Sequence, residues 1–178
     1  MSQDGLMDLN ATLRFDAAPS DVFAMLTDEG FLERKAQATY ALSQESTVTR
    51  DGDTATVKQM RELSGEELPD YARKFVGDRL TLHQTDQWRE SATDGSRPGT
   101  ISVRISGAPV TLDGTTSLTP ADDDGTEYQL WGRIKASVPF VGSKIEQTVH
   151  DALLSAVRTE ETAGQRWLAE QRGGERSV

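Results

Sequence analysis

The stretch Ser143–Arg172, SKIEQTVHDALLSAVRTEETAGQRWLAEQR, predicts one long C-terminal helix around which the rest of the chain is organised. Apolar side chains recur in it at spacings of three and four, and polar side chains fill the opposite face. The apolar positions are Ile145, Val149, Leu153, Ala156 and Val157. At about 1.5 Å per residue this helix would be roughly 45 Å long. Upstream segments must therefore supply a large apolar surface for it to cover.

The residues at both ends of this stretch predict where the helix begins and ends. Ser143 can cap the first turn with its side-chain oxygen, and Glu146, three residues later, completes the pattern of a capping box. Gly173 and Gly174 follow the last turn, and glycine is common where helices stop. We therefore expect the helix to end at Arg172.

The first part of the chain predicts one strand and two short helices. Apolar and polar residues alternate from Leu9 to Phe15, which is the period of a half-buried strand. Pro19 or Ser20 then begins a helix that reaches Leu26. A second short helix is expected over residues 31–38.

Strands and turns predominate between residues 40 and 138. The pattern predicts further strands separated by turn-forming residues such as the Asp-Gly pair at 51–52. These strands are expected at 40–49, 54–63, 80–90, 101–105, 110–118 and 128–138. The chain therefore predicts an α+β fold, in which a curved antiparallel sheet of about six or seven strands wraps around the long C-terminal helix.

Length and composition indicate one globular domain. A chain of 178 residues fits a single core better than two. We expect one domain over residues 8–172, with a disordered leader over 1–7 and a disordered tail over 173–178. The leader is polar and acidic, unlike a secretory signal, and no segment is apolar for long enough to span a membrane. These features predict a soluble cytoplasmic protein without membrane insertion.

Charge and the absence of cysteine argue against several classes of function. The formal net charge of −10, from 29 acidic and 19 basic residues, disfavours binding to nucleic acid or to an anionic membrane surface. The chain has no Cys, so it has no disulfide and no thiolate nucleophile. Its two histidines, His83 and His150, lie in different expected elements, which argues against a zinc site. We expect no metal and no cofactor.

The order of these elements resembles a known superfamily. The segment Leu9–Phe15, LNATLRF, followed by Ala18–Thr27, APSDVFAMLT, resembles the start of START-like, helix-grip domains of the SRPBCC superfamily, in which a strand precedes a P-x-x-V-F type helix. The closing segment Pro139–Leu168 is similar to their gripping helix. More narrowly, residues 7–170 resemble an uncharacterised bacterial branch of this superfamily with no assigned function.

The resemblance implies a hydrophobic cavity between the concave face of the sheet and the long helix. Ala152, Ala156 and Gly164 lie near the apolar stripe, where small side chains would leave space. The alternative is a solid core, in which these small residues let the helix approach the sheet closely. The residues expected to contact a bound molecule are Leu82, Asp86, Trp88, Ile101, Val103, Ile105, Leu112, Leu130, Ile134, Val149, Leu153 and Val157.

We therefore predict binding, sensing or transport of a small hydrophobic molecule, such as a lipid or a polyketide-like compound. If their face of the strand is concave, Gln84 and Asp86 place polar groups within an apolar wall, as a selective pocket requires. If the strand twists outward, both are solvated. Glu160 interrupts the apolar stripe of the helix. It either recognises a polar group of the ligand or, as is more common for a carboxylate, marks the point where the helix becomes solvated.

An irregular segment, residues 64–78, borders the expected cavity. Gly65 and Gly77 break its regularity, together with Pro69. We expect the segment to cover the cavity mouth as a gate, with Leu68, Tyr71 and Phe75 as its apolar side chains. The alternative is an ordinary packed connector.

Two alternatives from other functional classes stay open. An enzyme of the cyclase or dehydratase type, which some members of the resembled superfamily are, would use Tyr40, Arg61, Asp86 or Arg133 in the same cavity. The sequence contains no motif for a serine nucleophile, a P-loop or a dinucleotide site. An interaction module would instead have a solid core and an exposed apolar patch, around Trp131 or the 64–78 segment. No feature of the sequence specifies a protein partner.

Overall fold

The computed structural model describes residues 6–175 and confirms the expected order of elements. The elements are β1 (Leu6–Phe15), α1 (Pro19–Leu26), α2 (Glu29–Ala38), β2 (Ser43–Asp51), β3 (Thr54–Ser64), α3 (Asp70–Val76), β4 (Arg79–Trp88), β5 (Arg97–Ile105), β6 (Val110–Pro120), β7 (Thr126–Ala136) and α4 (Gly142–Glu175). The irregular segment between β3 and β4 thus contains one short helix, α3.

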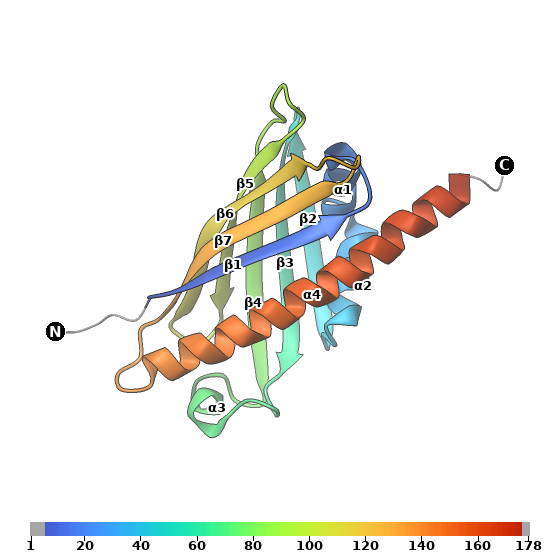
Figure 1. Ribbon diagram of the computed structural model, residues 1–178. Coiled ribbons are helices and arrows are strands. Elements are labelled where there is room, and N and C mark those ends of the chain that lie inside the picture. The colour runs from blue at the N-terminus through green and yellow to red at the C-terminus, as the bar shows by residue number, and fades with distance from the viewer. Residues whose placement is uncertain (1–5, 176–178) are drawn as a thin grey trace.

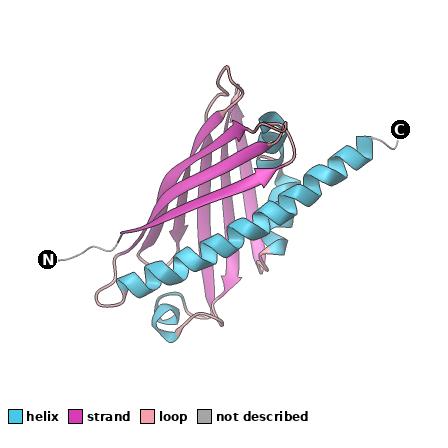
Figure 2. Cartoon of the chain, viewed as in Figure 1, coloured by secondary structure: helices cyan, strands magenta, loops and turns pink. Residues whose placement is uncertain are grey.

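Seven strands form one antiparallel sheet in the order β1-β7-β6-β5-β4-β3-β2. Neighbours in the sheet are also consecutive strands in the chain except β1 and β7, so the last strand returns beside the first. The sheet is curved, and α4 runs diagonally across its concave side (Figure 1; Figure 2). This is the α+β arrangement that the sequence predicts.

The alternation of side chains along each strand decides which residues meet α4. In β7, Tyr128, Leu130 and Ile134 are buried, whereas Trp131 and Arg133 are exposed on the other face. This is the period of two expected for a strand with one buried face. The same alternation points the apolar side chains of the central strands toward α4.

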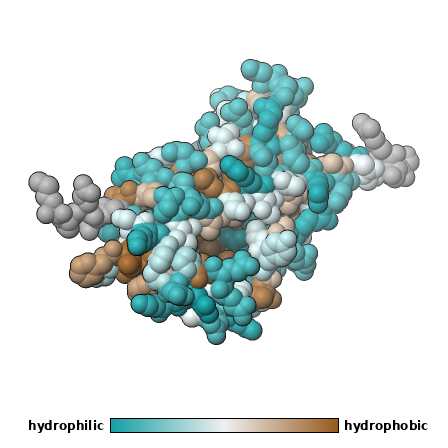
Figure 3. Space-filling view, turned by 60° about the horizontal axis from the view of Figure 1, so that its bottom comes forward, coloured by the Kyte–Doolittle hydropathy of each residue, from teal (hydrophilic) through white to brown (hydrophobic). Residues whose placement is uncertain are grey.

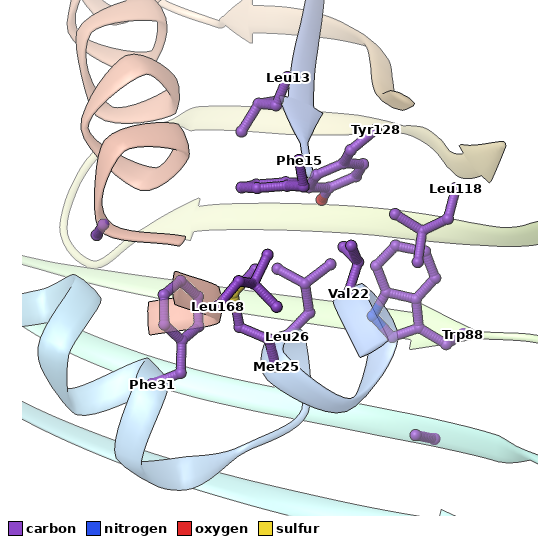
Figure 4. Close-up of a cluster of buried hydrophobic side chains, with 12 residues drawn as sticks. Leu13, Phe15, Val22, Met25, Leu26, Phe31, Trp88, Leu118, Tyr128 and Leu168 are labelled. Carbon is purple, nitrogen blue, oxygen red and sulfur yellow. The ribbon is translucent and has the colours of Figure 1, made fainter. Parts of the chain in front are cut away.

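The end of the sheet near α1 and α2 is filled by large side chains. Phe15, Met25 and Leu168 are among the residues that pack together there (Figure 4). Gly164 of α4 lies at this end, and a Cβ at its position would come within 2.5 Å of Phe15 Cε1. Gly164 therefore lets the helix approach the sheet closely, and the expectation that it leaves space for a ligand is wrong at this position.

The N-terminal half of α4 covers a second apolar cluster. Leu9, Leu112 and Ile134 of the sheet are buried in this cluster together with Ile145 of α4. The short helix α3 lies at this end of the molecule, away from α1 and α2 (Figure 1). The two halves of α4 thus lie in different surroundings.

Both ends of α4 differ from the sequence prediction. The Glu146 carboxylate accepts a hydrogen bond from the Ala136 backbone N–H at 3.1 Å, so it ties α4 to the end of β7 and does not complete a capping box. The helix continues through Gly173 and Gly174 to Glu175, because neither glycine adopts the left-handed conformation that ends a helix.

The expected termini overlap the regular elements. Strand β1 begins at Leu6, so Leu6 and Met7 of the expected leader belong to the sheet. Residues 173–175 of the expected tail belong to α4. The rest of both expected segments, 1–5 and 176–178, lies outside the described residues.

Candidate functional site

A cavity of about 130 Å³ lies beneath the N-terminal half of α4. Thr148 is the one polar residue among the described residues that line it. The lining consists of Leu63, Leu68, Ala72, Phe75, Val76, Leu80, Leu82, Ile105, Ala108, Pro109, Val110, Val138, Ile145, Thr148, Val149, Ala152 and Leu153. Figure 3 brings the α3 end forward and shows a hollow in this face, with hydrophobic side chains beside it. We call this space the larger cavity.

The segment that carries α3 closes one side of the larger cavity. Its ends are held together by a hydrogen bond from the Gly65 N–H to the Asp78 carbonyl, at 2.7 Å. Leu68 and Phe75, two of the predicted gate residues, line the cavity. The third, Tyr71, contacts α4 through its hydroxyl, which lies 2.8 Å from Thr148 Oγ1. The segment is therefore attached to α4 by a side-chain contact that can break without unfolding either element.

A second space of about 40 Å³, the smaller cavity, lies beneath the middle of α4. Its lining is Leu9, Leu13, Lys35, Thr39, Arg61, Gln84, Ile101, Val103, Leu112, Tyr128, Leu130, Leu153, Ala156, Val157 and Glu160. Leu153 is the only described residue that lines both cavities. Leu153 therefore lies between the two spaces, and the smaller one differs from the larger in having three charged residues in its lining, Lys35, Arg61 and Glu160.

Two buried polar residues on the concave face, Arg61 and Asp86, are joined by the half-buried Gln84 in a hydrogen-bonded relay. Arg61 Nη2 on β3 donates to Gln84 Oε1 at 3.1 Å, and Gln84 Nε2 donates to Asp86 Oδ2 at 2.9 Å. The guanidinium can only donate, so it fixes the amide of Gln84 with its oxygen toward Arg61 and its nitrogen toward Asp86. Arg61 and Asp86 are only 7% and 8% exposed.

An ion pair contributed by two helices stands beside this relay. Lys35 Nζ of α2 lies 3.8 Å from Glu160 Oε1 of α4, and both side chains are largely buried. The distance is an ion-pair distance and is too long for a hydrogen bond. With Arg61 and Asp86, the cluster holds two cationic and two carboxylate side chains, so its formal charges balance when all are ionised.

The surroundings of Asp86 shift the pKa values of this cluster. Burial raises the pKa of Asp86 to about 6, and the nearby Lys35, the Gln84 hydrogen bond and Arg61 oppose this rise, whereas Glu160 adds to it. Burial lowers the pKa of Arg61, against the attraction of Glu160 and Asp86. Burial raises the pKa of Tyr128 well above its usual value, with Glu160 and Asp86 acting in the same direction. The shifts arise because ionisable groups are held out of water.

Two atoms of the relay are buried without a hydrogen-bond partner. They are Arg61 Nε, a donor, and Asp86 Oδ1, an acceptor when the carboxyl is ionised. A buried polar group without a partner costs roughly 1–3 kcal/mol. Both atoms are also closed off from any water-sized group, so neither faces open space in this structure.

Most of the residues predicted to contact a ligand lie at the two cavities. Leu82, Ile105, Val149 and Leu153 line the larger cavity, and Ile101, Val103, Leu112, Leu130 and Val157 line the smaller one. Asp86, Trp88 and Ile134 line neither, so the prediction that these three contact a ligand is wrong for the two cavities. Trp88 packs against Phe23 and Tyr128 in the filled end of the core, with ring centroids 6.2 and 5.8 Å away, and Ile134 is fully enclosed by the sheet and its neighbours.

The sequence analysis did not identify Lys35 of α2 as a site residue, and it left the role of Glu160 of α4 open. Lys35 follows Phe31 and Leu32 at spacings of four and three, so it shares the buried face of α2. That spacing is a signal that could have identified it. Glu160 does not mark the point where α4 becomes solvated, because its side chain faces Lys35 and lines the smaller cavity.

The structure brings together two of the four residues proposed for a cyclase or dehydratase. Tyr40 is 88% exposed in a left-handed turn after α2. Arg133 lies on the outer face of the sheet, over the Trp131 ring and 3.4 Å from the Asp8 carboxylate. Arg61 and Asp86 lie together under α4, joined through Gln84, whereas Tyr40 and Arg133 lie away from them.

The expected interaction surface is not a continuous apolar patch. Trp131 is 42% exposed, and its sheet neighbours Asn10 and Thr115 are polar. The apolar residues of the 64–78 segment are half-buried against the larger cavity. Within residues 6–175, no group of three or more potential metal-ligating side chains comes together, and no helix is long and apolar enough to cross a membrane.

The curved seven-stranded sheet, the two short helices after β1 and the long C-terminal helix define a START-like helix-grip fold. The chain belongs to the family described as protein of unknown function (DUF2505), whose sequence profile matches residues 10–168. An uncharacterized protein of Mycobacterium tuberculosis H37Rv is 25% identical over 119 residues, which cover 66% of this chain and 68% of the relative.

Solved structures share the fold at low sequence identity. A protein of Thermus thermophilus is 14% identical, with a TM-score of 0.58, over 90% of this chain and 95% of its own. The lipid transfer and protein localization domain of human StarD13 is 11% identical, with a TM-score of 0.57, over 88% and 76%. Norcoclaurine synthase from Thalictrum flavum is 12% identical, with a TM-score of 0.55, over 93% and 88%. These similarities establish the fold and leave the ligand to be argued from the site.

Proposed function

We propose that this protein binds a small apolar molecule in the larger cavity. The observation that carries the proposal is a space of about 130 Å³ with an almost wholly apolar lining, beneath a helix whose other half covers a filled core. Protein interiors normally pack without such spaces. An empty cavity lowers the stability of the protein, because the side chains that line it lose van der Waals contacts. A bound apolar molecule restores those contacts.

The volume of the cavity sets the size of its occupant in the closed form. An apolar cavity of about 150 Å³ stays dry and binds benzene. The larger cavity therefore suits one aromatic ring or a short branched chain, and a lipid or polyketide-like compound needs more room, which displacement of α3 would supply. The Tyr71–Thr148 contact is the attachment that such a movement would break.

The comparisons support a binding function without naming the ligand. The StarD13 domain is described as a lipid transfer domain. A crystal structure of norcoclaurine synthase contains dopamine and hydroxybenzaldehyde. The same fold thus accompanies binding of small organic molecules in those proteins, and the apolar cavity is the feature of this chain suited to that role.

Titration with toluene, followed by NMR of the side-chain methyl groups, tests the proposal. We expect saturable shifts at Leu82, Ile105 and Val149, which line the larger cavity. Val149→Phe should fill the cavity and abolish binding. Ala169→Phe is the matched control, because it adds the same ring on an exposed position of α4. Absence of saturable shifts in the wild type, or binding that Val149→Phe leaves intact, would overturn the proposal.

A further inference from the structure

We infer that the free edge of β2 pairs with the β2 edge of a second copy of this chain, so that two sheets join across a two-fold axis at Thr47. This surface is separate from the two cavities, and the inference does not depend on the proposed function. The sheet is open, and β1 and β2 are its edge strands. A strand edge carries unpaired backbone N–H and C=O groups, which can bind another strand unless something covers them.

The protein covers the β1 edge with side chains of α4. The Arg14 N–H donates to Glu161 Oε2 at 2.7 Å, and Gln165 Nε2 donates to the Arg14 carbonyl at 2.9 Å. Just beyond the strand, the Asp16 N–H donates to Gln165 Oε1 at 3.1 Å. These side chains satisfy backbone groups that a further strand would otherwise bind.

The β2 edge has no such cover. Asp51 and Thr54 pair across a two-residue turn, and hydrogen-bonded pairs alternate from there along β2 and β3. The odd-numbered residues of β2 therefore direct their N–H and C=O groups toward β3. The even-numbered residues direct theirs outward, and they are Gln44, Ser46, Val48 and Arg50. Among the described residues, none forms a hydrogen bond with these outward backbone groups.

The sequence of β2 also lacks the features that usually keep an edge strand from pairing. Over Ser43–Asp51, SQESTVTRD, it contains no Lys, Pro or Gly, and its nine residues exceed the usual strand length of about five or six. The helix α2 packs against one face of β2, and the side chains of Glu45, Thr47 and Thr49 are exposed on the other. The edge is therefore long, regular and open to a partner strand.

The direction of the free groups restricts how two copies can pair. Because only even-numbered residues point outward, they must lie opposite even-numbered residues of the other copy. A two-fold axis at Thr47 achieves this over the whole strand, since it pairs Gln44 with Arg50 and Ser46 with Val48. On the exposed face it places Thr47 opposite Thr47, Glu45 opposite Thr49 and Ser43 opposite Asp51, so no like charges lie directly opposite each other.

The neighbouring registers are worse. A shift by two residues in one direction would place Glu45 opposite Asp51, which are both carboxylates. A shift in the other direction would require an outward N–H from Leu42, but that group already donates to the Glu62 carbonyl at 2.7 Å. The register about Thr47 is therefore the one that uses the full edge without repulsion.

A second copy is the partner that these features favour. Pairing about a two-fold axis consumes both free edges and stops at two molecules. Leu42, which is 53% exposed, precedes the strand, and this register brings it beside Gly52 of the other copy. No described atom lies within 4 Å of a Cβ at Gly52, so the turn leaves room for the leucine side chain.

The pair is expected to be weak and reversible. One pair of strands buries little surface, and interfaces below about 1,200 Å² are typical of transient association. The formal net charge of −10 on each copy also opposes it. Salt screens this repulsion, so association should strengthen as the salt concentration rises.

Sedimentation velocity of the full chain, from about 1 μM to about 1 mM, tests the inference. We expect a reversible monomer–dimer equilibrium that salt strengthens. Amide hydrogen exchange followed by NMR over the same range locates the interface. The outward amides should exchange more slowly as the dimer forms, whereas the inward amides, already bonded to β3, should change little. The outward set is Gln44, Ser46, Val48 and Arg50, and the inward set is Glu45, Thr47 and Thr49.

Ser46→Pro tests the backbone pairing. It removes an outward N–H and no hydrogen bond to β3, a position at which edge strands tolerate proline. Both copies lose the group, so the dissociation constant should rise by about tenfold or more. Ser46→Ala keeps the N–H and is the matched control, with an unchanged dissociation constant.

Two lysine variants test the register. Thr47→Lys places two lysines opposite each other at the axis, whereas Thr49→Lys places each new lysine opposite Glu45 of the other copy. Both variants change the net charge equally and on the same face, so each is the control for the other. The dissociation constant of Thr47→Lys should exceed that of Thr49→Lys by roughly five- to tenfold.

Each contrary outcome overturns a stated part of the inference. A wild type that stays monomeric up to about 1 mM overturns it entirely, even if the edge then binds an extended segment of another protein. A dimer in which the outward amides exchange unchanged, or in which Ser46→Pro and Ser46→Ala associate equally, forms elsewhere on the surface. Equal dissociation constants for the two lysine variants rule out the register about Thr47. The wild-type and lysine measurements decide the matter even if Ser46→Pro does not fold.

Discussion

The Tyr71 hydroxyl lies 2.8 Å from Thr148 Oγ1, and this contact joins α3 to α4 beside the larger cavity. Tyr71→Phe should remove it and leave the ring in place. Loss of one hydrogen bond from the closed form, about 0.5–1.5 kcal/mol, should raise the uptake rate of an apolar probe by about two- to tenfold. Stopped-flow fluorescence with N-phenyl-1-naphthylamine measures this rate. Tyr40→Phe, at an exposed position, is the control. An unchanged rate in Tyr71→Phe would mean that the segment is only a packed connector.

Leu153 separates the two cavities, so its truncation should join them. Leu153→Ala is expected to lower the free energy of unfolding by about 2–4 kcal/mol, the usual cost of such a cavity. The same change should strengthen binding of 4-phenylbutan-1-ol relative to toluene, because the longer molecule no longer has to displace Leu153. Urea unfolding and calorimetric titration measure the two effects. Leu154→Ala, in the same cluster but lining neither cavity, should lower stability without altering this preference.

Asp86 should make stability fall as pH rises. Its pKa is about 6 in the folded protein against an ordinary value of 3.8, so the folded state holds the proton more tightly than the unfolded state. The stabilisation from protonated Asp86 is complete below about pH 4 and is lost as the pH rises to about 6. The shift corresponds to about 3 kcal/mol at 1.36 kcal/mol per pKa unit.

Unfolding in urea at pH 4, 5, 6 and 7 measures this dependence. The difference in unfolding free energy between wild type and Asp86→Asn isolates the contribution of Asp86 from those of the other carboxylates. That difference includes the response of the facing groups Lys35, Arg61, Glu160 and Tyr128. We expect the wild type to lose stability relative to the variant over this range. A flat difference, or one of opposite sign, would show that Asp86 is not buried as described.

Gly164 and Gly174 should respond oppositely to alanine. A Cβ at Gly164 would contact Phe15 at 2.5 Å and Met25 at 3.0 Å, so Gly164→Ala should overpack the core and lower stability by about 1–3 kcal/mol. Among the described residues, no neighbouring atom lies within 4 Å of a Cβ at Gly174. Gly174→Ala should therefore be neutral or raise stability, by up to about 1 kcal/mol, through helix propensity. Thermal unfolding followed by circular dichroism compares the two, and equal responses would contradict the close packing at Gly164.

The fold could be predicted because its signals are local. The apolar stripe of α4 and the alternation in β7 are periodicities within single elements, and each points its apolar face at the same core. The order of these strands and helices along the chain is compatible with only a few ways of packing a sheet against a helix. The cavity-lining residues of the central strands follow from the same alternation.

The polar part of the site depends on contacts between distant elements. Glu160 and Lys35 are both charged residues at positions where the helical spacing predicts an apolar side chain. Only the packing of α2 against α4 brings the two together. Trp88 was placed on the correct face of β4, but α1 fills the space beside it with Phe23. The assembled fold decides which end of the sheet is filled by side chains and which end keeps a cavity. The apolar periodicity of single helices and strands does not predict this.

The most direct test of the account is a crystal structure of the protein soaked with iodobenzene, in which anomalous scattering locates the iodine. We expect an iodine peak inside the larger cavity, within contact distance of Phe75, Leu82 and Val149, and no such peak in Val149→Phe. Density that shows the cavity filled by the protein's own side chains, with iodine only on the surface, would contradict it.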